Sequence, residues 1–144
     1  MPNNSDPLCV CLDANVIISA IAFGGKPLEI LERTLCREFL SVTGLNIIDE
    51  VERNLVGKLG LKKEQVSLTL NDLLEVSSVF IPPGHLQLVD SVGDNLVLEV
   101  ADAGGCDILV TGDRKHLLPL GTFKTVIIEP PSAFLLRLNS RKNR

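Results

Sequence analysis

Residues 9–20 read CVCLDANVIISA, and this stretch decides the fold prediction for the chain. The apolar residues from Cys9 to Leu12 are typical of a strand buried on both faces of a sheet. Asp13 and Asn15 then interrupt the apolar run, two positions apart, so that in a strand their side chains point the same way. An ionised Asp13 among apolar neighbours needs a cation or several hydrogen-bond donors. The alternative is an ordinary strand-to-loop turn, which Asp and Asn often form.

Outward from this stretch, strand and helix patterns alternate along the chain. Short apolar runs predict four further strands, at residues 38–43, 79–83, 106–113 and 124–131. Amphipathic patterns predict helices at residues 24–37, 44–60, 62–78, 93–105 and 132–139. The alternation predicts an α/β fold, a three-layer α/β/α arrangement with a mainly parallel sheet of about five strands. Because we find no internal repeat or linker, we expect one domain over residues 1–144, with an ordered core at about 8–138 and polar ends.

The composition sets bounds on function. The chain has 144 residues, a net charge of −4 and 3% aromatic residues, a balance that disfavours a basic, aromatic-lined binder of bulk nucleic acid. A domain that gathers carboxylates around cations is also acidic, however.

The four cysteines lack zinc spacing and any CxxC pair, so we expect free thiols. No apolar run reaches the ~18 residues of a membrane span, and the opening MPNNSDP does not read as a signal peptide, so we expect a cytoplasmic protein.

Three acidic residues stand where predicted strands end or helices begin. Asp13 lies near the end of the first strand, Asp113 follows the apolar run ILVT with one glycine between, and Asp94 opens the helix at 93–105. Because ligands of parallel sheets bind beyond the carboxyl ends of the strands, we expect these carboxylates to converge. Each has a plainer alternative, since Asp94 and Asp113 could simply cap the helices that follow them.

A fourth carboxylate is expected from the helix at 44–60. At ~100° per residue, Glu50 and Glu52 flank the apolar stripe on opposite sides. The spacing narrows the choice to these two residues and does not separate them. For either one, the alternative is a solvated surface charge.

Four carboxylates brought together repel one another, so the cluster requires a divalent cation. Mg²⁺ and Mn²⁺ prefer oxygen ligands, and such oxygen-only clusters serve phosphodiester hydrolysis. An aspartyl-nucleophile phosphatase is a weaker interpretation, because it needs a DxD-type strand end and this chain has Asp13-Ala14-Asn15. His85 and His116 are lone histidines in the sequence, and we assign neither a role.

Four segments, LDANVIISA, IIDEVERNL, GDNLVLEVADAGGCDILVTGD and HLLPL, together resemble PIN-domain proteins. The branch they resemble contains toxin components of toxin–antitoxin systems and is related to the virulence-associated toxin ribonucleases. The resemblance covers roughly residues 9–136. It implies a parallel sheet flanked by helices, Mg²⁺ or Mn²⁺ in an acidic pocket, and endonucleolytic cleavage of RNA. It further implies a homodimer and an antitoxin protein as partner.

The resemblance also implies which residues form the site. The catalytic and metal-binding acids fall on Asp13, Glu50, Asp94 and Asp113. It favours Glu50 over Glu52, which spacing alone does not.

Further residues follow from the same motifs. Asn15 and Thr111 accompany the acids as auxiliary residues, and Asp90 is an auxiliary acid. Many relatives carry another acid after the fourth, whereas this chain continues with Arg114, Lys115 and His116, which leaves open whether one or two metals bind. We expect Arg114 and Lys115 to contact phosphate, with a solvated charge pair as the alternative. A degenerate PIN domain that binds RNA or protein without cutting remains the alternative function.

Overall fold

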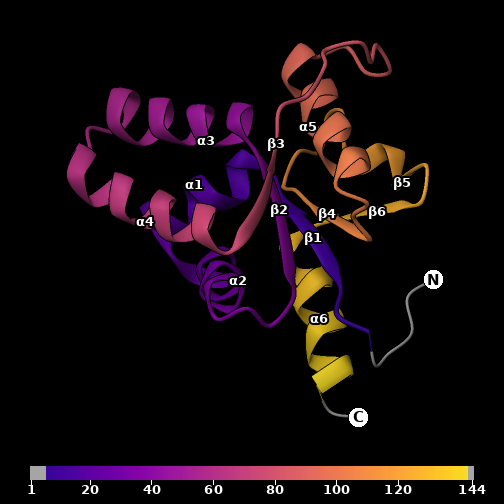
Figure 1. The fold of residues 1–144 in the computed structure, drawn as a ribbon, viewed down its shortest axis with the longest axis horizontal. Helices are drawn as coiled ribbons and strands as arrows, with labels where there is room; N and C mark the ends of the chain where they lie inside the picture. Colours follow the sequence, from indigo (N-terminus) through magenta and orange to yellow (C-terminus); the bar gives the residue numbers. More distant parts are fainter. Residues whose placement is uncertain (1–5, 143–144) are drawn as a thin grey trace.

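The computed structural model describes residues 6–142 (Figure 1). Residues 1–5, which form most of the segment examined for a signal peptide, and residues 143–144 lie outside the described residues. The described residues contain a six-stranded sheet in the order β3-β2-β1-β4-β6-β5. The strands are β1 Cys9–Leu12, β2 Leu40–Gly44, β3 Ser77–Phe80, β4 Ile108–Val110, β5 Thr122–Phe123 and β6 Val126–Glu129. All pairings are parallel except that of β5 with β6, so the prediction of a mainly parallel α/β sheet is confirmed.

The sheet has one strand more than the sequence predicted. The additional strand, β5, is only two residues long and pairs with β6 through a tight turn in which Lys124 has φ of 53°. A strand this short cannot show the alternation on which sequence-based strand prediction depends. The extra strand lies at the edge of the sheet and leaves the other five as expected.

Strand β1 lies at the centre of the sheet, between β2 and β4. Val10 and Cys11 have 0% exposure, as expected for a strand covered on both faces. From β1 the chain steps outward to β2 and β3, and it then returns to the other side of β1 to form β4. The strand order therefore reverses between β1 and β4, and the carboxyl ends of these two strands border the usual ligand position of open α/β sheets.

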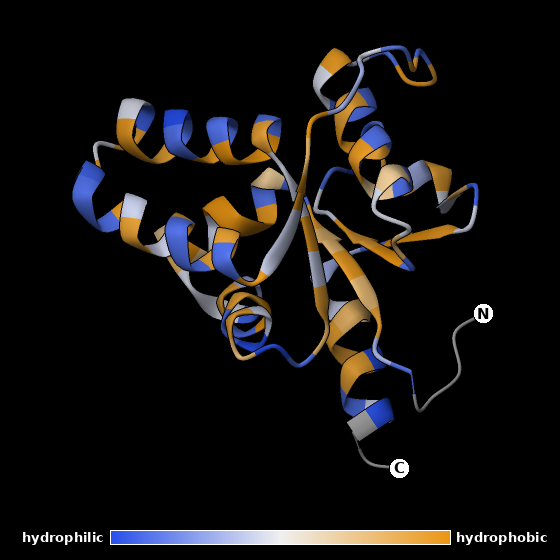
Figure 2. Ribbon diagram, viewed as in Figure 1, coloured by the Kyte–Doolittle hydropathy of each residue, from blue (hydrophilic) through white to orange (hydrophobic). Residues whose placement is uncertain are grey.

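Helices cover both faces of the sheet, which confirms the three layers. The helices are α1 Ala14–Phe23, α2 Gly25–Leu35, α3 Leu45–Glu52, α4 Lys63–Glu75, α5 Val92–Ala103 and α6 Pro131–Lys142. Figure 1 shows α1 to α4 on one side of the sheet and α5 on the other. Helix α6 packs against α2. Figure 2 shows that the apolar sides of the helices face inward, toward the sheet.

Helix α1 corrects the prediction for the opening stretch. The sequence predicts Asp13 and Asn15 together at the end of a strand, whereas the strand ends at Leu12 and Asp13 is the N-cap of α1. Asn15 lies in the first turn of that helix. The run NVIISAIAF has the β-branched residues of a strand, but the N-cap and packing against the sheet determine its helical state. The helix ends at Gly24, whose φ of 79° favours glycine.

The helix predicted at residues 44–60 forms in two pieces. Helix α3 ends at Glu52, and residues Arg53–Lys58 continue as a π-helix. The Asn54 side chain donates a hydrogen bond of 2.8 Å to the carbonyl oxygen of Glu50. Sequence periodicity does not reveal such a change of helical pitch, because π-helices are rare.

No single helix within residues 6–142 is long and apolar enough to cross a membrane. Helices α1 and α2 pass that test only as a bent pair, by length and composition alone.

Candidate metal centre

Asp13 is a buried carboxylate at the carboxyl end of β1, and only 4% of its surface is exposed. Its Oδ1 atom accepts a hydrogen bond of 2.7 Å from the backbone N–H of Ala14. Its Oδ2 atom accepts 2.7 Å from the hydroxyl of Thr111 and 3.1 Å from the side-chain amide of Asn15. These donors compensate in part for the lost hydration that an ionised carboxylate would otherwise retain.

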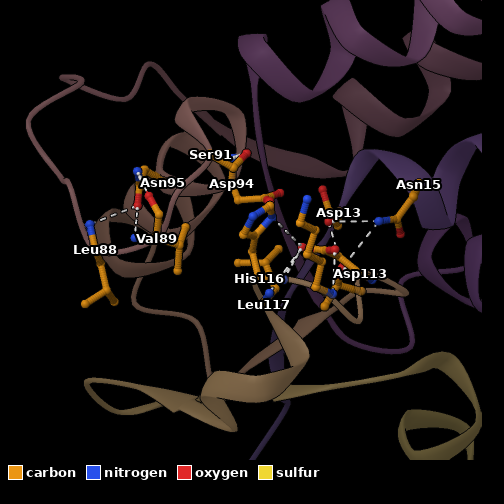
Figure 3. Close-up of polar contacts among 12 residues, drawn as sticks. Asp13, Asn15, Leu88, Val89, Ser91, Asp94, Asn95, Asp113, His116 and Leu117 are labelled. Carbon is orange, nitrogen blue, oxygen red and sulfur yellow. Dashed lines mark hydrogen bonds and ion pairs between the residues drawn. The ribbon is translucent and has the colours of Figure 1, made fainter.

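Thr111 connects Asp13 to the residues that follow β4. The hydroxyl of Thr111 accepts a hydrogen bond of 3.0 Å from the backbone N–H of Asp113 and one of 3.4 Å from the Asn15 amide. The Asn15 oxygen in turn accepts from the N–H of Gly112 at 3.1 Å. The ends of β1 and β4 are therefore joined by side chains, and two of the three predicted auxiliary residues, Asn15 and Thr111, lie in this network. Figure 3 shows the hydrogen bond between Asn15 and Asp13.

Asp113 caps the turn that follows β4. Its Oδ1 accepts from the N–H of Lys115 at 3.1 Å, and its Oδ2 accepts from the N–H groups of His116 at 3.2 Å and Leu117 at 3.1 Å. Although desolvation acts to raise the pKa of Asp113, these backbone donors and a hydrogen bond with Asp94 hold that pKa below its ordinary value. The capping alternative is thus fulfilled, and the same carboxylate still faces the cluster.

Asp94 lies in the first turn of α5, but it is not the cap of that helix. Ser91 is the N-cap, and its hydroxyl accepts a hydrogen bond of 3.2 Å from the backbone N–H of Asp94. The carboxylate of Asp94 is therefore free to turn toward Asp113 and His116, as Figure 3 shows. Burial, followed by the charge of Asp113, raises the pKa of Asp94.

Asn95 fixes the loop that leads into α5. It is 7% exposed, and its side-chain oxygen accepts from the backbone N–H groups of Leu88 at 3.1 Å and Val89 at 3.0 Å. Its amide donates back to the Val89 carbonyl at 2.9 Å (Figure 3). These contacts hold the first turn of α5, and with it Asp94, at a defined place beside the end of β4.

His116 is a member of the cluster that the sequence analysis missed. Its Nδ1 atom lies 3.0 Å from Oδ2 of Asp94 and 3.8 Å from Oδ2 of Asp113. The spacing of three residues between Asp113 and His116 was the available signal, because a helical turn places such residues on one face. The sequence analysis treated His116 as a lone histidine, since Asp94 is distant along the chain.

The remaining predicted residues are more exposed. Glu50 is exposed on α3, and its charge contributes to the raised pKa of Asp13. Asp90 is exposed in the loop before α5, and it makes none of the cluster's hydrogen bonds within residues 6–142. Arg114 and Lys115 are exposed in the turn after Asp113. Their side chains point to solvent while the backbone of Lys115 supports Asp113.

The electrostatics of the cluster show how strongly its acids affect one another. The pKa of Asp13 is raised to about 6, with burial as the largest cause. The hydrogen bonds from Thr111 and Ala14 lower it in part, and repulsion from Asp94 and Glu50 raises it further. A raised pKa means that the protein alone stabilises the ionised carboxylate poorly, and a bound cation would stabilise that charge.

The donor set fits a divalent cation. Asp94, Asp113 and His116 offer ligand atoms that all lie within 4.8 Å of one another, and all three side chains are partly accessible. Two ligands bound at right angles to one cation at ~2.1 Å lie ~3.0 Å apart, and opposed ligands lie ~4.2 Å apart. The separations of 3.0 Å and 3.8 Å at His116 fall in that range. The arrangement can therefore hold a cation next to Asp13, at a site open to a substrate.

Comparison with known proteins agrees with the fold. A family model described as PIN domain matches residues 9–115. Among solved structures, the chain is similar to the crystal structure of VapBC2 from Rickettsia felis bound to a DNA fragment from their promoter. The TM-score is 0.61 at 19% sequence identity, and the match covers 85% of this chain and 98% of that chain. No curated protein matches the chain.

Proposed function

The chain belongs to the PIN-domain family, and from that premise we propose that it is a metal-dependent endoribonuclease that hydrolyses RNA phosphodiester bonds with Mg²⁺ or Mn²⁺. The observation that carries the proposal is the group of Asp94, Asp113 and His116, whose ligand atoms lie within 4.8 Å of one another and which the Thr111 hydroxyl connects to Asp13. The raised pKa values of Asp13 and Asp94 support it, because carboxylates that are buried and also repel one another are typical of sites built for a cation.

In this proposal, the acids hold the cation, and Asp13 is the most buried of them. Three donors fix the Asp13 carboxylate, so its orientation does not depend on the substrate. Asn15 and Thr111 are positioning residues that fix Asp13 and the turn carrying Asp113. When bound, a divalent cation supplies Lewis-acid chemistry, which activates water and offsets charge on the phosphate.

Four exposed residues complete the proposed site. Arg114 and Lys115 follow Asp113 directly, and their exposed side chains are suited to contact the phosphates of RNA. Asp90 precedes α5 and is proposed as an auxiliary acid that acts through solvent. The fourth metal-binding acid is Glu50, as the family resemblance implies, and its charge contributes to the raised pKa of Asp13.

We further propose that the chain is the toxin of a toxin–antitoxin pair, acts in the cytoplasm and forms a homodimer. The similar solved structure is of VapBC2 bound to promoter DNA, and this likeness supports an antitoxin protein as partner. Co-expression of the chain with the protein encoded beside it, followed by co-purification, tests the partnership. A chain that always purifies alone and does not impair growth when expressed would contradict it.

The test of the nuclease function is cleavage of diverse RNAs by the purified protein. We expect cleavage with Mn²⁺ or Mg²⁺, and none in the presence of a chelator. Asp13→Asn should abolish cleavage while the circular dichroism spectrum is preserved, because the amide keeps the shape of the side chain and removes the charge that binds the cation.

A matched pair on α3 separates the proposed ligand from its neighbour. Glu50→Gln should lower the cleavage rate at least tenfold, whereas Glu52→Gln should leave it unchanged, although both variants remove one charge from the same helix. If the wild type cleaves no RNA with either metal but still binds RNA or a partner, the alternative of a non-cleaving binding domain is supported instead. Cleavage that survives Asp13→Asn would point to a contaminating nuclease.

A further inference from the structure

His116 brings a nitrogen atom into a cluster that is otherwise made of oxygen. Its Nδ1 lies 3.0 Å from Asp94 and 3.8 Å from Asp113, and its side chain is 20% exposed. Asp94 comes from α5 and Asp113 from the turn after β4, so the imidazole lies between two elements that are distant in sequence. Figure 3 shows the ring directed at both carboxylates.

The backbone fixes this position. The N–H of His116 donates to Oδ2 of Asp113 at 3.2 Å, and the next residue, Leu117, has 0% exposure and anchors the turn in the core. Within residues 6–142, the ring contacts polar groups only through its Nδ1 atom. The other ring nitrogen therefore remains able to carry the proton of a neutral imidazole whose Nδ1 binds a metal.

We infer that Nδ1 of His116 is itself a ligand of the divalent cation, together with Asp94 and Asp113, and that it gives this site a preference for first-row transition-metal ions over Mg²⁺. The inference rests on the proposed function and identifies the class of cofactor. Mg²⁺ is a hard ion that takes oxygen ligands, whereas imidazole suits transition metals, whose affinities rise from Mn²⁺ through Co²⁺. A mixed carboxylate and imidazole set should therefore bind Mn²⁺ and Co²⁺ more tightly than Mg²⁺.

An alternative role for His116 predicts the opposite effect of removing its side chain on metal affinity. If the imidazole only fills the place of the cation and donates a hydrogen bond to Asp94, a cation must displace it. Removing the ring would then increase the affinity for Mg²⁺ and Mn²⁺ alike. As a ligand, by contrast, the ring contributes to binding, and its removal weakens the binding of transition metals most.

The experiment compares metal binding by the wild type and by His116→Ala, with His85→Ala as the matched control. His85 is the other histidine of the chain, it is exposed in a loop away from the cluster, and its backbone N–H donates to the carboxylate of Glu99. Calorimetry with Mn²⁺ and with Mg²⁺ gives the affinity ratio. Electron paramagnetic resonance of the Mn²⁺ complex, with electron spin echo detection, reports nitrogen-14 in the coordination shell independently of activity.

We expect the wild type and His85→Ala to bind Mn²⁺ more tightly than Mg²⁺ and to show nitrogen-14 modulation. In His116→Ala, Mn²⁺ affinity should fall about tenfold or more, Mg²⁺ affinity should fall less, and the nitrogen signal should disappear. Absence of nitrogen modulation in the wild type would overturn the inference. So would an equal loss of both affinities, or an increase of both, in His116→Ala.

The outcomes also separate this inference from the proposed function. If the protein cleaves RNA with Mn²⁺ but shows no nitrogen ligand, the proposed nuclease function is supported and the proposed role of His116 is contradicted. If the protein binds Mn²⁺ through nitrogen but cleaves no RNA, His116 is supported as a ligand and the proposed nuclease function is contradicted. A wild type that binds neither metal overturns both.

Discussion

The hydroxyl of Thr111 has 0% exposure and three hydrogen-bond partners, which makes it the centre of the network around the acids. It donates to Asp13 at 2.7 Å and accepts from the N–H of Asp113 at 3.0 Å, so one oxygen atom fixes both strand ends. Thr43 provides a natural contrast. It is 2% exposed, and within residues 6–142 its buried hydroxyl has no hydrogen-bond partner.

Replacing each threonine by the isosteric valine therefore has opposite expected effects. Thr111→Val leaves the Asp13 carboxylate short of a donor and the N–H of Asp113 without an acceptor, and should lower the free energy of unfolding by ~1–3 kcal/mol. Thr43→Val removes an unpaired buried hydroxyl, and should leave that free energy unchanged or raise it by up to ~1 kcal/mol. Urea unfolding in chelator measures both.

Activity gives a second readout for the same pair. Thr111→Val should also reduce RNA cleavage, because Asp13 loses the donor that orients it, whereas Thr43→Val should not. Equal shifts of the two unfolding midpoints would contradict the assigned role of Thr111.

The residues of the candidate site differ in how readily the sequence predicts them. Asp13 and Asp113 stand out because a carboxylate at the end of an apolar strand is costly unless it has a function. Glu50 required the family resemblance, since periodicity leaves Glu52 equally placed. His116 became visible only in three dimensions, because its partner Asp94 belongs to a different element.

At the scale of elements, the same limits decide which helices and strands were predictable. Strand β1 and helix α5 have strong patterns, and both were predicted. Helix α1 was not, because its β-branched residues Val16, Ile17 and Ile18 continue the apolar run of β1 without a change of period. The capping geometry of Asp13 separates strand from helix, and that geometry is a property of the folded chain.

The packing of α5 against β2 depends on a glycine at the end of that strand. A Cβ atom at Gly44 would lie 2.7 Å from Cγ2 of Val100 and 3.2 Å from the backbone oxygen of Phe80, and it would also meet the side chain of Asn46. The backbone of Gly44, with φ of −133° and ψ of 154°, is one that any residue adopts. The requirement for glycine is therefore steric.

Gly44→Ala should accordingly push α5 away from β2 and lower the free energy of unfolding by ~1–3 kcal/mol. Gly57→Ala is the matched control. A Cβ there meets nothing within 4 Å, and alanine in that π-helical segment should stabilise the protein by ~0.5–1 kcal/mol. Thermal unfolding distinguishes the two. Two alanine variants of equal stability would show that α5 does not approach the strand this closely.

At the scale of the whole molecule, the charge balance opposes the proposed substrate. The chain carries a net charge of −4, and the cluster adds carboxylates at the point where an RNA phosphate would have to bind. Attraction must therefore be local, from the cation and from basic side chains beside it. Arg114 and Lys115 are exposed immediately after Asp113 and are the basic residues best placed for this.

The salt dependence of RNA binding tests this arrangement. Each phosphate contact adds ~0.7 to the negative slope of log affinity against log salt for a single strand. Two contacts predict that Arg114→Ala/Lys115→Ala makes the slope shallower by ~1.4. Fluorescence anisotropy with the non-cleaving Asp13→Asn protein as parent, at fixed Mn²⁺, measures it.

The matched control removes the same charge elsewhere. Lys62→Ala/Lys63→Ala neutralises two exposed residues at the start of α4, on the opposite side of the sheet from α5. This variant makes the protein equally more acidic, so it changes only the long-range field, which salt screens within ~10 Å at 0.1 M. Its slope should equal that of the parent. If both double variants changed the slope by the same amount, RNA would respond to overall charge, and Arg114 and Lys115 would not be phosphate contacts.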